Sequence, residues 1–336
     1  MSIFPGGNMI RIVLAFSVVA LLSTAVRSQT PPDTPRSASL PKFDHIVIVM
    51  EENKYYDEVI GNAAAPYINR VLREEGANLT HMYAEEHNSE GNYFWLFSGS
   101  NQSVGFDDVI PSRKTHRVYP FRTSNMAQQL REKGFTFRGY AEDLPATGST
   151  VTKVGHYARK HVPWISFGNI PQGANPDSST NLAFAQFPSD FSKLPTVAIV
   201  VPNLINDMHD PGNHPEIAVK NGDAWLKKNI DPFYQWAKTH NSLLIVTWDE
   251  SDDPTSFMGL TDPSSRYVDI QNRIPTIFAG AHVKHGDYEE GTGVTHVNIL
   301  RTIEAVYGLR QSGTQPPNAL RFGITSEYVI KDVFAP

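Results

Sequence analysis

The chain of 336 residues contains no cysteine. Disulfide bonds, zinc sites built from thiolates and a cysteine nucleophile are therefore excluded. A core of roughly 300 residues buries enough apolar surface to fold without disulfides. The lack of cysteine is thus compatible with a stable globular protein, even outside the cell.

Positive charge is also scarce. The 29 Lys and Arg residues are outnumbered by 35 Asp and Glu, which gives a net charge of -6. This balance argues against a nucleic-acid surface, because such affinity rests mainly on Lys and Arg that neutralise phosphates. Small phosphorylated substrates remain compatible with it. With 40% hydrophobic and 19% charged residues, the composition is that of a globular protein, and disordered or collagen-like classes are excluded.

An extended apolar run is found only near the N-terminus, at residues 12–22, directly after Arg11. At about 11 residues it is too short to span a bilayer. The small residues Val26 and Ser28 suit a cleavage site, so we predict a signal peptide over 1–28. The protein would then be secreted or periplasmic, with no stable membrane insertion after cleavage. An uncleaved membrane anchor is the alternative.

After the signal peptide, the Pro/Ser-rich stretch 29–42 predicts a disordered leader, and 43–336 a single domain. Short apolar runs typical of strands buried on both faces occur at 45–50, 135–140, 197–202, 243–248 and 274–279. Between them, helices are expected at 65–76, at 124–134 with Ser124 as N-cap, and at 295–308. Polar stretches rich in proline and glycine are expected to be loops over one edge, at 100–120, 141–192 and 251–272. The alternation predicts an α/β fold with a mostly parallel central sheet.

Acidic residues gather where three of these strands should end. The polar residues in these positions are Glu51, Glu52, Asn53, Asp207, His209, Asp210, Asp249 and Glu250. In open α/β sheets, functional groups lie beyond the carboxyl ends of the strands, so these side chains should share one edge. Crowded carboxylates repel one another unless a cation or hydrogen-bond donors offset them. The pattern favours a divalent metal site of the Mg, Ca, Mn or Zn type. Separate solvated loops or helix caps are the alternative.

The segment 87–101 combines an apolar stretch with a hydroxyl. Tyr93 to Phe97 should form a buried helix, with Ser89 just ahead of it and Gly91 allowing close backbone approach. A hydroxyl at a helix N-terminus has the backbone N–H groups and the helix dipole available to bind an anion. Ser89 is therefore a candidate nucleophile. An ordinary helix cap is the alternative.

Segments in a fixed order from about Phe43 to Leu309 carry a family resemblance. They are HIVIVMEENKYYDEVIGN, HNSEGNYFWLFSGS, YAEDLP, YARKHVPW, NDMHD, GDAWLKKN, VTWDESDD and THVNILRTIEAVYGL. Together they resemble the phosphoesterase family of secreted acid phosphatases and phospholipase C-like enzymes, within the alkaline phosphatase superfamily. The resemblance implies a three-layer alkaline phosphatase-like sandwich. One departure is Gly91, where relatives usually have proline.

The resemblance also implies roles for individual residues. The expected metal ligands are Glu52, Asn53, Asp249, Glu250 and the nucleophile Ser89. Residues placed where the superfamily builds a second metal or proton-transfer site are Asp207, His209 and His296. The residues expected to hold the phosphoryl group or to lie beside the nucleophile are Asn92, Lys160, His161 and His87. One or two divalent metal ions per chain are expected. Such an ion would activate Ser89 to form a phosphoserine intermediate.

These observations predict an exported, metal-dependent acid phosphatase that hydrolyses small phosphate monoesters. A phospholipase C-like phosphodiesterase stays open, because the loops that would decide between the two have no readable pocket chemistry. A metal-independent serine esterase is a further alternative, since HNSEG is one residue from G-x-S-x-G and Ser89, Asp249 and His296 follow the hydrolase order. A non-catalytic exported binding protein would explain the carboxylates but not the hydroxyl. The oligomeric state is not predicted.

Overall fold

The computed structural model describes residues 40–104, 109–252, 272–289, 293–321 and 323–335. The predicted signal peptide, most of the predicted leader and most of the predicted loop 251–272 lie outside these ranges. Ser39–Pro336 forms one compact unit. Within the described ranges, no helix combines the length and the apolar character that a bilayer crossing requires.

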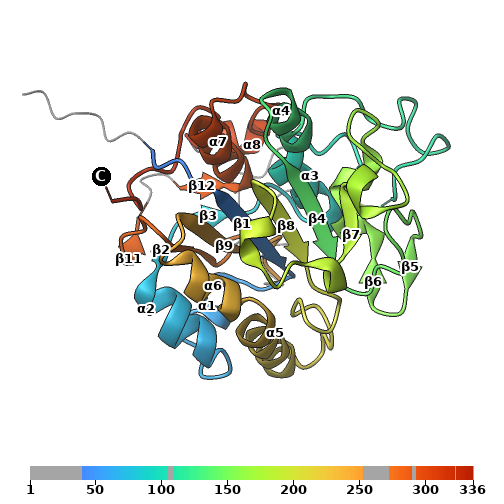
Figure 1. Ribbon diagram of the computed structural model, residues 1–336. Coiled ribbons are helices and arrows are strands. Elements are labelled where there is room, and N and C mark those ends of the chain that lie inside the picture. The colour runs from blue at the N-terminus through green and yellow to red at the C-terminus, as the bar shows by residue number, and fades with distance from the viewer. Residues whose placement is uncertain (1–39, 105–108, 253–271, 290–292, 322, 336) are drawn as a thin grey trace, which may run out of the picture. The chain divides into compact units, whose positions relative to one another are not determined.

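A sheet of eight strands forms the middle layer of this unit (Figure 1). Its strands are β1 (His45–Glu51), β2 (Ala77–Leu79), β4 (Phe137–Ala141), β7 (Asn181–Ala183), β8 (Val197–Val201), β9 (Ser242–Trp248), β10 (Thr276–Gly280) and β11 (Gly286–Tyr288). They are arranged in the order β11-β2-β10-β9-β1-β8-β4-β7. Among the described strands of this sheet, β10 alone runs against its neighbours. The predicted mostly parallel sheet is confirmed.

The three central strands β8, β1 and β9 lie deepest in the core. Val47 of β1 pairs with Ala198 of β8 on one side and with Leu244 of β9 on the other. All three side chains are fully buried. Because both faces of these strands are covered, their sequences are apolar throughout and do not alternate with polar residues.

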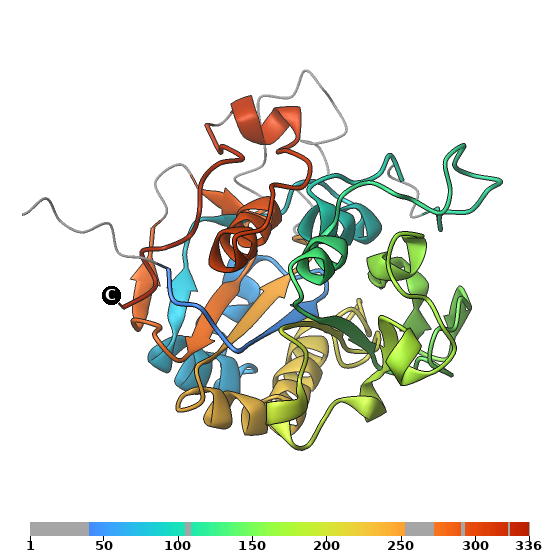
Figure 2. The same ribbon diagram turned by 45° about the horizontal axis from the view of Figure 1, so that its top comes forward.

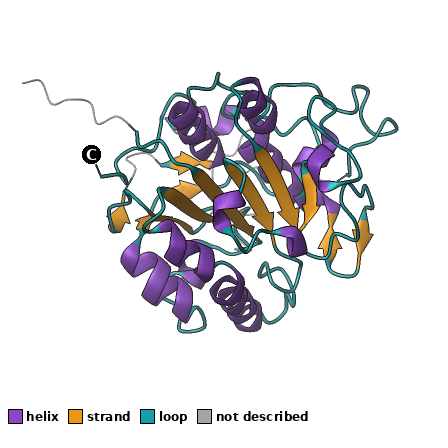
Figure 3. Ribbon diagram, in the orientation of Figure 1, coloured by secondary structure: helices purple, strands orange, loops and turns teal. Residues whose placement is uncertain are grey.

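Helices cover both faces of the sheet (Figures 2 and 3). One face carries α3 (Ser89–Ser98), α4 (Met126–Glu132) and α7 (His296–Tyr307), which pack on one another, with the short α8 (Pro317–Arg321) nearby. The other face carries α1 (Tyr56–Val59), the π-helical turn η1 (Ile68–Leu72), α2 (Arg73–Glu75), α5 (Pro215–Asn229) and α6 (Asp231–Ala237). The result is the predicted three-layer α/β sandwich.

Two further two-stranded ladders and several 3-10 turns lie in the connections. One ladder pairs β3 (Met82–Tyr83) with β12 (Val294–Thr295), and the other pairs β5 (Lys153–Val154) with β6 (Tyr157–Ala158). The 3-10 turns are η2 (Arg159–His161), η3 (Pro163–Ser166), η4 (Pro176–Ser178), η5 (Phe184–Gln186) and η6 (Phe191–Lys193). The stretch 141–192, predicted as a loop, therefore contains strand β7 and a hairpin of β5 and β6.

One predicted helix start is wrong. The N-cap of the helix expected over 124–134 is Asn125, because its side chain accepts a hydrogen bond of 2.9 Å from the Gln128 N–H. Ser124 lies one residue before the cap. The helix expected over 295–308 begins as predicted, with Thr295 as its N-cap.

Candidate active site at the carboxyl edge of the sheet

The ends of β1 and β9 bring two acidic pairs together. Glu51 is in register with Trp248, so the residues that follow each strand are neighbours. The Asp249 N–H donates to the Glu51 carbonyl at 3.0 Å. The Asn53 N–H donates to Oδ1 of Asp249 at 2.9 Å. The carboxyl groups of Glu52 and Asp249 are completely buried at this edge, at 0% exposure each.

The loop after β8 adds a third carboxylate. The Glu52 N–H donates to the Asp207 carbonyl at 2.6 Å, which fixes this loop beside β1. Oδ1 of Asp207 accepts from the His209 N–H at 2.9 Å, whereas Oδ2 is buried and has no hydrogen-bond partner among the described residues. The convergence of the three predicted strand ends on one edge is therefore present in the structure.

Ser89 is the first residue of α3, and the preceding N-cap is Asn88, with φ of 83°. The Asn88 N–H donates to Oε2 of Glu250 at 2.9 Å, which holds the start of the helix against the carboxylates. The Ser89 hydroxyl oxygen lies 3.1 Å from Oε2 of Glu52 and 3.4 Å from Oε1 of Glu250. Nζ of Lys160 approaches the same oxygen to 3.4 Å. The candidate nucleophile thus has the carboxylates of Glu52, Glu250 and Asp249 and one cation around it.

The segment before α3 explains why residue 91 is a glycine. A Cβ at Gly91 would overlap the carboxyl group of Glu86. Both polar atoms of the Asn92 side chain bind the Glu86 backbone, at 3.1 Å to its N–H and 2.6 Å to its carbonyl. Asn92 therefore holds this turn in place. This position differs from the one expected for Asn92, which was beside the phosphoryl group. His87 binds Oε2 of Glu250 through Nδ1 at 2.8 Å.

Ser89 contacts Oε2 of Glu52, whereas His161 contacts the other carboxyl oxygen, Oε1. Its Nε2 is 3.2 Å from Oε1 of Glu52, and its Nδ1 is 3.9 Å from Oδ2 of Asp207. The Tyr93 hydroxyl donates to the same Oε1 at 2.6 Å, and its ring stacks on that of His161 with centroids 5.0 Å apart. The sequence reasoning placed Tyr93 in the buried helix only. The signal for its second role was its hydroxyl, which needs a partner when it is buried.

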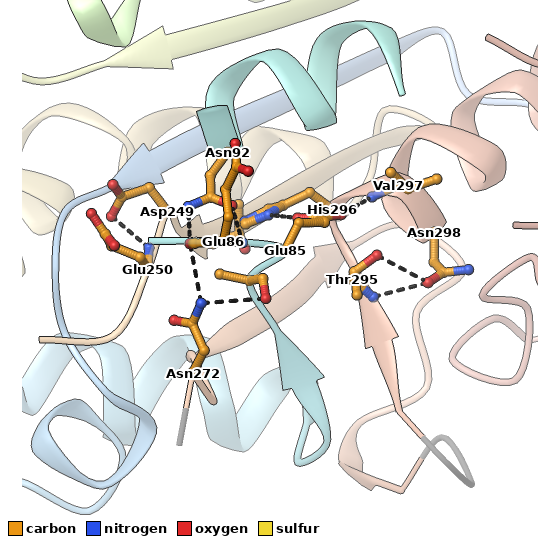
Figure 4. A network of polar contacts seen from close by, with 12 residues as sticks. Glu85, Glu86, Asn92, Asp249, Glu250, Asn272, Thr295, His296, Val297 and Asn298 are labelled. Carbon is orange, nitrogen blue, oxygen red and sulfur yellow. Dashed lines mark hydrogen bonds and ion pairs between the residues drawn. The ribbon is translucent and has the colours of Figure 1, made fainter. Parts of the chain in front are cut away.

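His296 departs from its expected place in a second metal site. It is the first residue of α7, and Figure 4 shows its ring next to Glu85. Nδ1 is 2.6 Å from Oε2 of Glu85, and Nε2 is 2.8 Å from the Trp248 carbonyl. Glu85 also accepts from the Val297 N–H at 2.8 Å. His296 therefore has no ring nitrogen left to coordinate an ion. It supports the end of β9 just before Asp249.

Burial and mutual repulsion dominate the electrostatics of this edge. Burial raises the pKa of Glu52 well above its usual range, and the neighbouring Asp249 and Asp207 add to the effect, while Lys160 opposes it. Burial and the charge of Glu250 raise the pKa of Asp249 to about 7. Burial also raises the pKa of Asp207. An additional positive charge at this edge would stabilise the ionised carboxylates.

The donor set fits a divalent cation in charge and chemical type. Oxygen atoms from carboxylates, an amide and a hydroxyl suit a hard cation, and the unpartnered Oδ2 of Asp207 offers a further donor. In the described part of the chain, however, no three acidic or histidine side chains already enclose an ion-sized position. The residues that would hold the ion are those at the three strand ends and the start of α3. Small side-chain rotations would have to accompany binding.

Comparisons with known proteins agree with this arrangement. A protein of the alkaline phosphatase superfamily from Vibrio parahaemolyticus has a similar fold, with a TM-score of 0.54 over 81% of this chain and 70% of that one, at 14% sequence identity. This likeness shows that the two proteins share a fold. The chain belongs to the Phosphoesterase family, whose pattern matches residues 63–310, and it is a phosphoric ester hydrolase.

Two relatives give the names found in this family. A phosphatidylinositol-3-phosphatase from Mycobacterium tuberculosis is 40% identical over 309 residues, which cover 90% of this chain and 91% of that protein. A probable acid phosphatase from Kluyveromyces lactis is 26% identical over 82% of this chain, which spans 61% of that longer protein. The likeness to the mycobacterial protein extends over nearly the full length of both chains.

Proposed function

We propose that this protein is an exported, metal-dependent acid phosphatase that hydrolyses phosphate monoesters through a phosphoserine intermediate. The observation that carries the proposal is the position of Ser89. Its hydroxyl lies at the N-terminus of a buried helix, within 3.4 Å of Lys160 and of two carboxylates. This combination provides a nucleophile, acceptors for its proton and positive charge for a phosphoryl group.

In the proposed reaction, the Ser89 oxygen attacks phosphorus while the bond to the leaving oxygen breaks, and this oxygen takes up a proton and leaves as the alcohol. Glu52, at 3.1 Å, is placed to accept the hydroxyl proton. The ammonium group of Lys160 and the N-terminal N–H groups of α3 face the negative charge that spreads over the phosphoryl oxygens. Water then cleaves the phosphoserine and releases phosphate. A bound divalent cation would neutralise the carboxylates and lower the pKa of the serine hydroxyl.

The names of the relatives favour monoester substrates over diesters. A phosphatidylinositol-3-phosphatase and an acid phosphatase both release phosphate from a monoester, and the first is 40% identical to this chain. The predicted phosphodiesterase is the alternative that substrate tests must separate. Export is proposed from the signal-like residues 1–28 alone.

The serine esterase alternative conflicts with the geometry. In that mechanism a histidine must lie between the serine and an aspartate. His296 instead binds Glu85 and the Trp248 carbonyl. The alternative of a binding protein without catalysis does not account for the contact between Lys160 and Ser89.

The proposal is tested by hydrolysis of p-nitrophenyl phosphate and bis-p-nitrophenyl phosphate from roughly pH 5 to 8, with EDTA and after addition of single divalent metals. We expect monoester cleavage that EDTA abolishes and a divalent metal restores. Preferential diester cleavage would favour the phosphodiesterase. Full activity in EDTA would contradict the metal requirement.

Two variants locate the chemistry within the chain. Ser89→Ala should reduce turnover by at least about 1000-fold while metal stays bound. Ser98→Ala is the matched control, because its hydroxyl lies at the other end of α3 and binds the Phe94 carbonyl. Asp249→Asn should lower metal affinity by about 10-fold or more, measured by calorimetry. Near-normal turnover of Ser89→Ala would remove Ser89 from the mechanism.

A further inference from the structure

A cavity of about 260 Å³ shares Lys160 with the site around Ser89. Its lining residues are Ile110, Thr152, Lys153, Ala158, Arg159, Lys160, Leu204 and His209. We call it the leaving-group cavity. Lys160 belongs to both places, since it lines this cavity and its Nζ lies 3.4 Å from the Ser89 hydroxyl oxygen. A phosphoryl group held at Ser89 would therefore have the rest of its substrate close to the cavity.

The walls of the cavity are held in place by backbone hydrogen bonds. The Arg159 N–H donates to the Thr152 carbonyl at 3.0 Å, which joins the hairpin of β5 and β6 to the turn η2. The Leu204 N–H donates to the His156 carbonyl at 3.0 Å, which ties the loop after β8 to the same hairpin. These two bonds link the segments that form the walls of the cavity.

The side chains of the leaving-group cavity combine apolar surface with positive charge. Ile110, Ala158 and Leu204 provide apolar contacts, whereas Lys153, Arg159 and Lys160 are cationic. Among the lining residues that the structure describes, none is a carboxylate. Charged groups of one sign in a concave site attract ligands of the opposite sign. The lining therefore suits an organic group that carries a negative charge.

Arg159 gives the sharpest indication of an anionic ligand. Its terminal nitrogens donate to two neutral oxygens, the Thr150 carbonyl at 3.1 Å and the Tyr119 hydroxyl at 2.7 Å. Its Nε is buried and has no hydrogen-bond partner within the described ranges. Among the residues that the structure describes, no carboxylate forms an ion pair with Arg159. A guanidinium group held in this way has its charge available for a carboxylate or phosphate group.

We propose that the leaving-group cavity selects phosphate monoesters whose alcohol carries a second anionic group, such as another phosphate or a carboxylate. Lys153 and Arg159 are the specificity-determining residues, and the apolar walls contact the body of the alcohol. This inference rests on the proposed phosphatase function and names the substrate class for the same site.

Two matched substrates test the proposal: 4-carboxyphenyl phosphate and 4-carbamoylphenyl phosphate. They have nearly the same size and differ in the charge of one substituent. For the wild type, we expect kcat/KM to be about tenfold higher for the carboxylate, mainly through a lower KM. The preference should shrink as salt is added, because the contact lies near solvent.

The double variant Lys153→Gln, Arg159→Gln should bring the ratio of the two kcat/KM values close to one. The control Lys193→Gln, Lys331→Gln removes the same charge from two exposed positions that do not line the cavity. It should keep the wild-type ratio. Because Arg159 also supports its neighbours, Lys153→Gln is measured alone as well. The Lys153 side chain is exposed, and we expect its replacement to lower the ratio of the two kcat/KM values about threefold.

The outcomes separate this inference from the function on which it rests. Hydrolysis of both substrates with the same preference in the wild type, the double variant and the control would overturn the leaving-group cavity and leave the phosphatase standing. A preference that both charge-removing double variants lose equally would also overturn it, because overall charge would then be the cause. If the wild type hydrolyses neither these esters nor p-nitrophenyl phosphate, the proposed phosphatase itself fails.

Discussion

Glu86, in the turn before α3, should make the protein less stable as the pH rises. Glu86 is half-buried, and both of its carboxyl oxygens accept from Nδ2 of Asn101 at 3.0 Å. Burial raises the pKa of Glu86 from 4.5 to about 7, with a further contribution from Glu85, although the bonds from Asn101 act in the opposite direction. The folded protein therefore favours the protonated form of this side chain.

The sign and size of the effect follow from proton linkage. Between about pH 4.5 and pH 7, folded Glu86 holds a proton that the unfolded chain has released. Stability is highest below this window and is lost as the pH rises through it. The difference between the two pKa values corresponds to roughly 3 kcal/mol at most. Since Glu86 is only half-buried, we expect about 1–2 kcal/mol after solvent screening.

Glu86→Gln tests this reasoning. The neutral amide keeps an oxygen that accepts from Asn101, so the variant should lose the pH dependence and little else. At about pH 8 it should be more stable than the wild type by about 1–2 kcal/mol, and at about pH 4.5 the two should be equal. The measurement is urea unfolding in EDTA at a series of pH values. Glu327→Gln, at an exposed position, controls for the loss of one charge. Parallel stability curves for Glu86→Gln and the wild type would refute the reasoning.

Two further predictions concern buried groups that the chemistry does not use directly. Arg301 is 1% exposed and forms an ion pair of 2.6 Å with Glu304, so Arg301→Met should lower the free energy of unfolding by about 3–5 kcal/mol, measured in urea. An unchanged unfolding midpoint would contradict this. His296→Ala removes the support of the Trp248 carbonyl and leaves Glu85 buried without its partner. Turnover should fall about 10-fold or more, and KM should change little, in assays well below the unfolding temperature.

The central strands could be predicted from the sequence because they are covered on both faces. Continuous apolar runs gave the positions of β1, β8 and β9 to within a residue or two. The three-residue strands β2, β7 and β11 lie toward the edges of the sheet and are too short to show a periodicity. The reversed direction of β10 was also inaccessible, because an apolar run has no direction. The direction of β10 depends on its pairing with β2 and β9.

The candidate site was predictable where backbone topology alone brings residues together. Parallel strands end at the same edge, so the convergence of Glu52, Asp207 and Asp249 follows from their places after β1, β8 and β9. Side-chain direction does not follow from such placement. Asn92 is an example, because its side chain binds the Glu86 backbone, whereas the family resemblance implied a place beside the phosphoryl group.

The leaving-group cavity could not be found in the sequence for a different reason. Its cations come from a stretch that read as a polar loop, and a charged loop residue is usually solvated. Only the folded hairpin of β5 and β6 and the turn η2 place Lys153 and Arg159 around a common space. Irregular segments acquire such chemistry through tertiary contacts, which leave no periodic pattern in the sequence.

Burial separates the acidic edge from ordinary acidic loops. If each cluster were a solvated loop or a helix cap, its carboxylates would be exposed to water. Glu52, Asp207 and Asp249 are instead completely buried, and burial raises the pKa of each. Taking several like charges out of water destabilises a fold unless an opposite charge is bound there. Lys160 supplies one such charge but faces three carboxylates, so the remaining imbalance is the physical argument for a divalent cation at this edge.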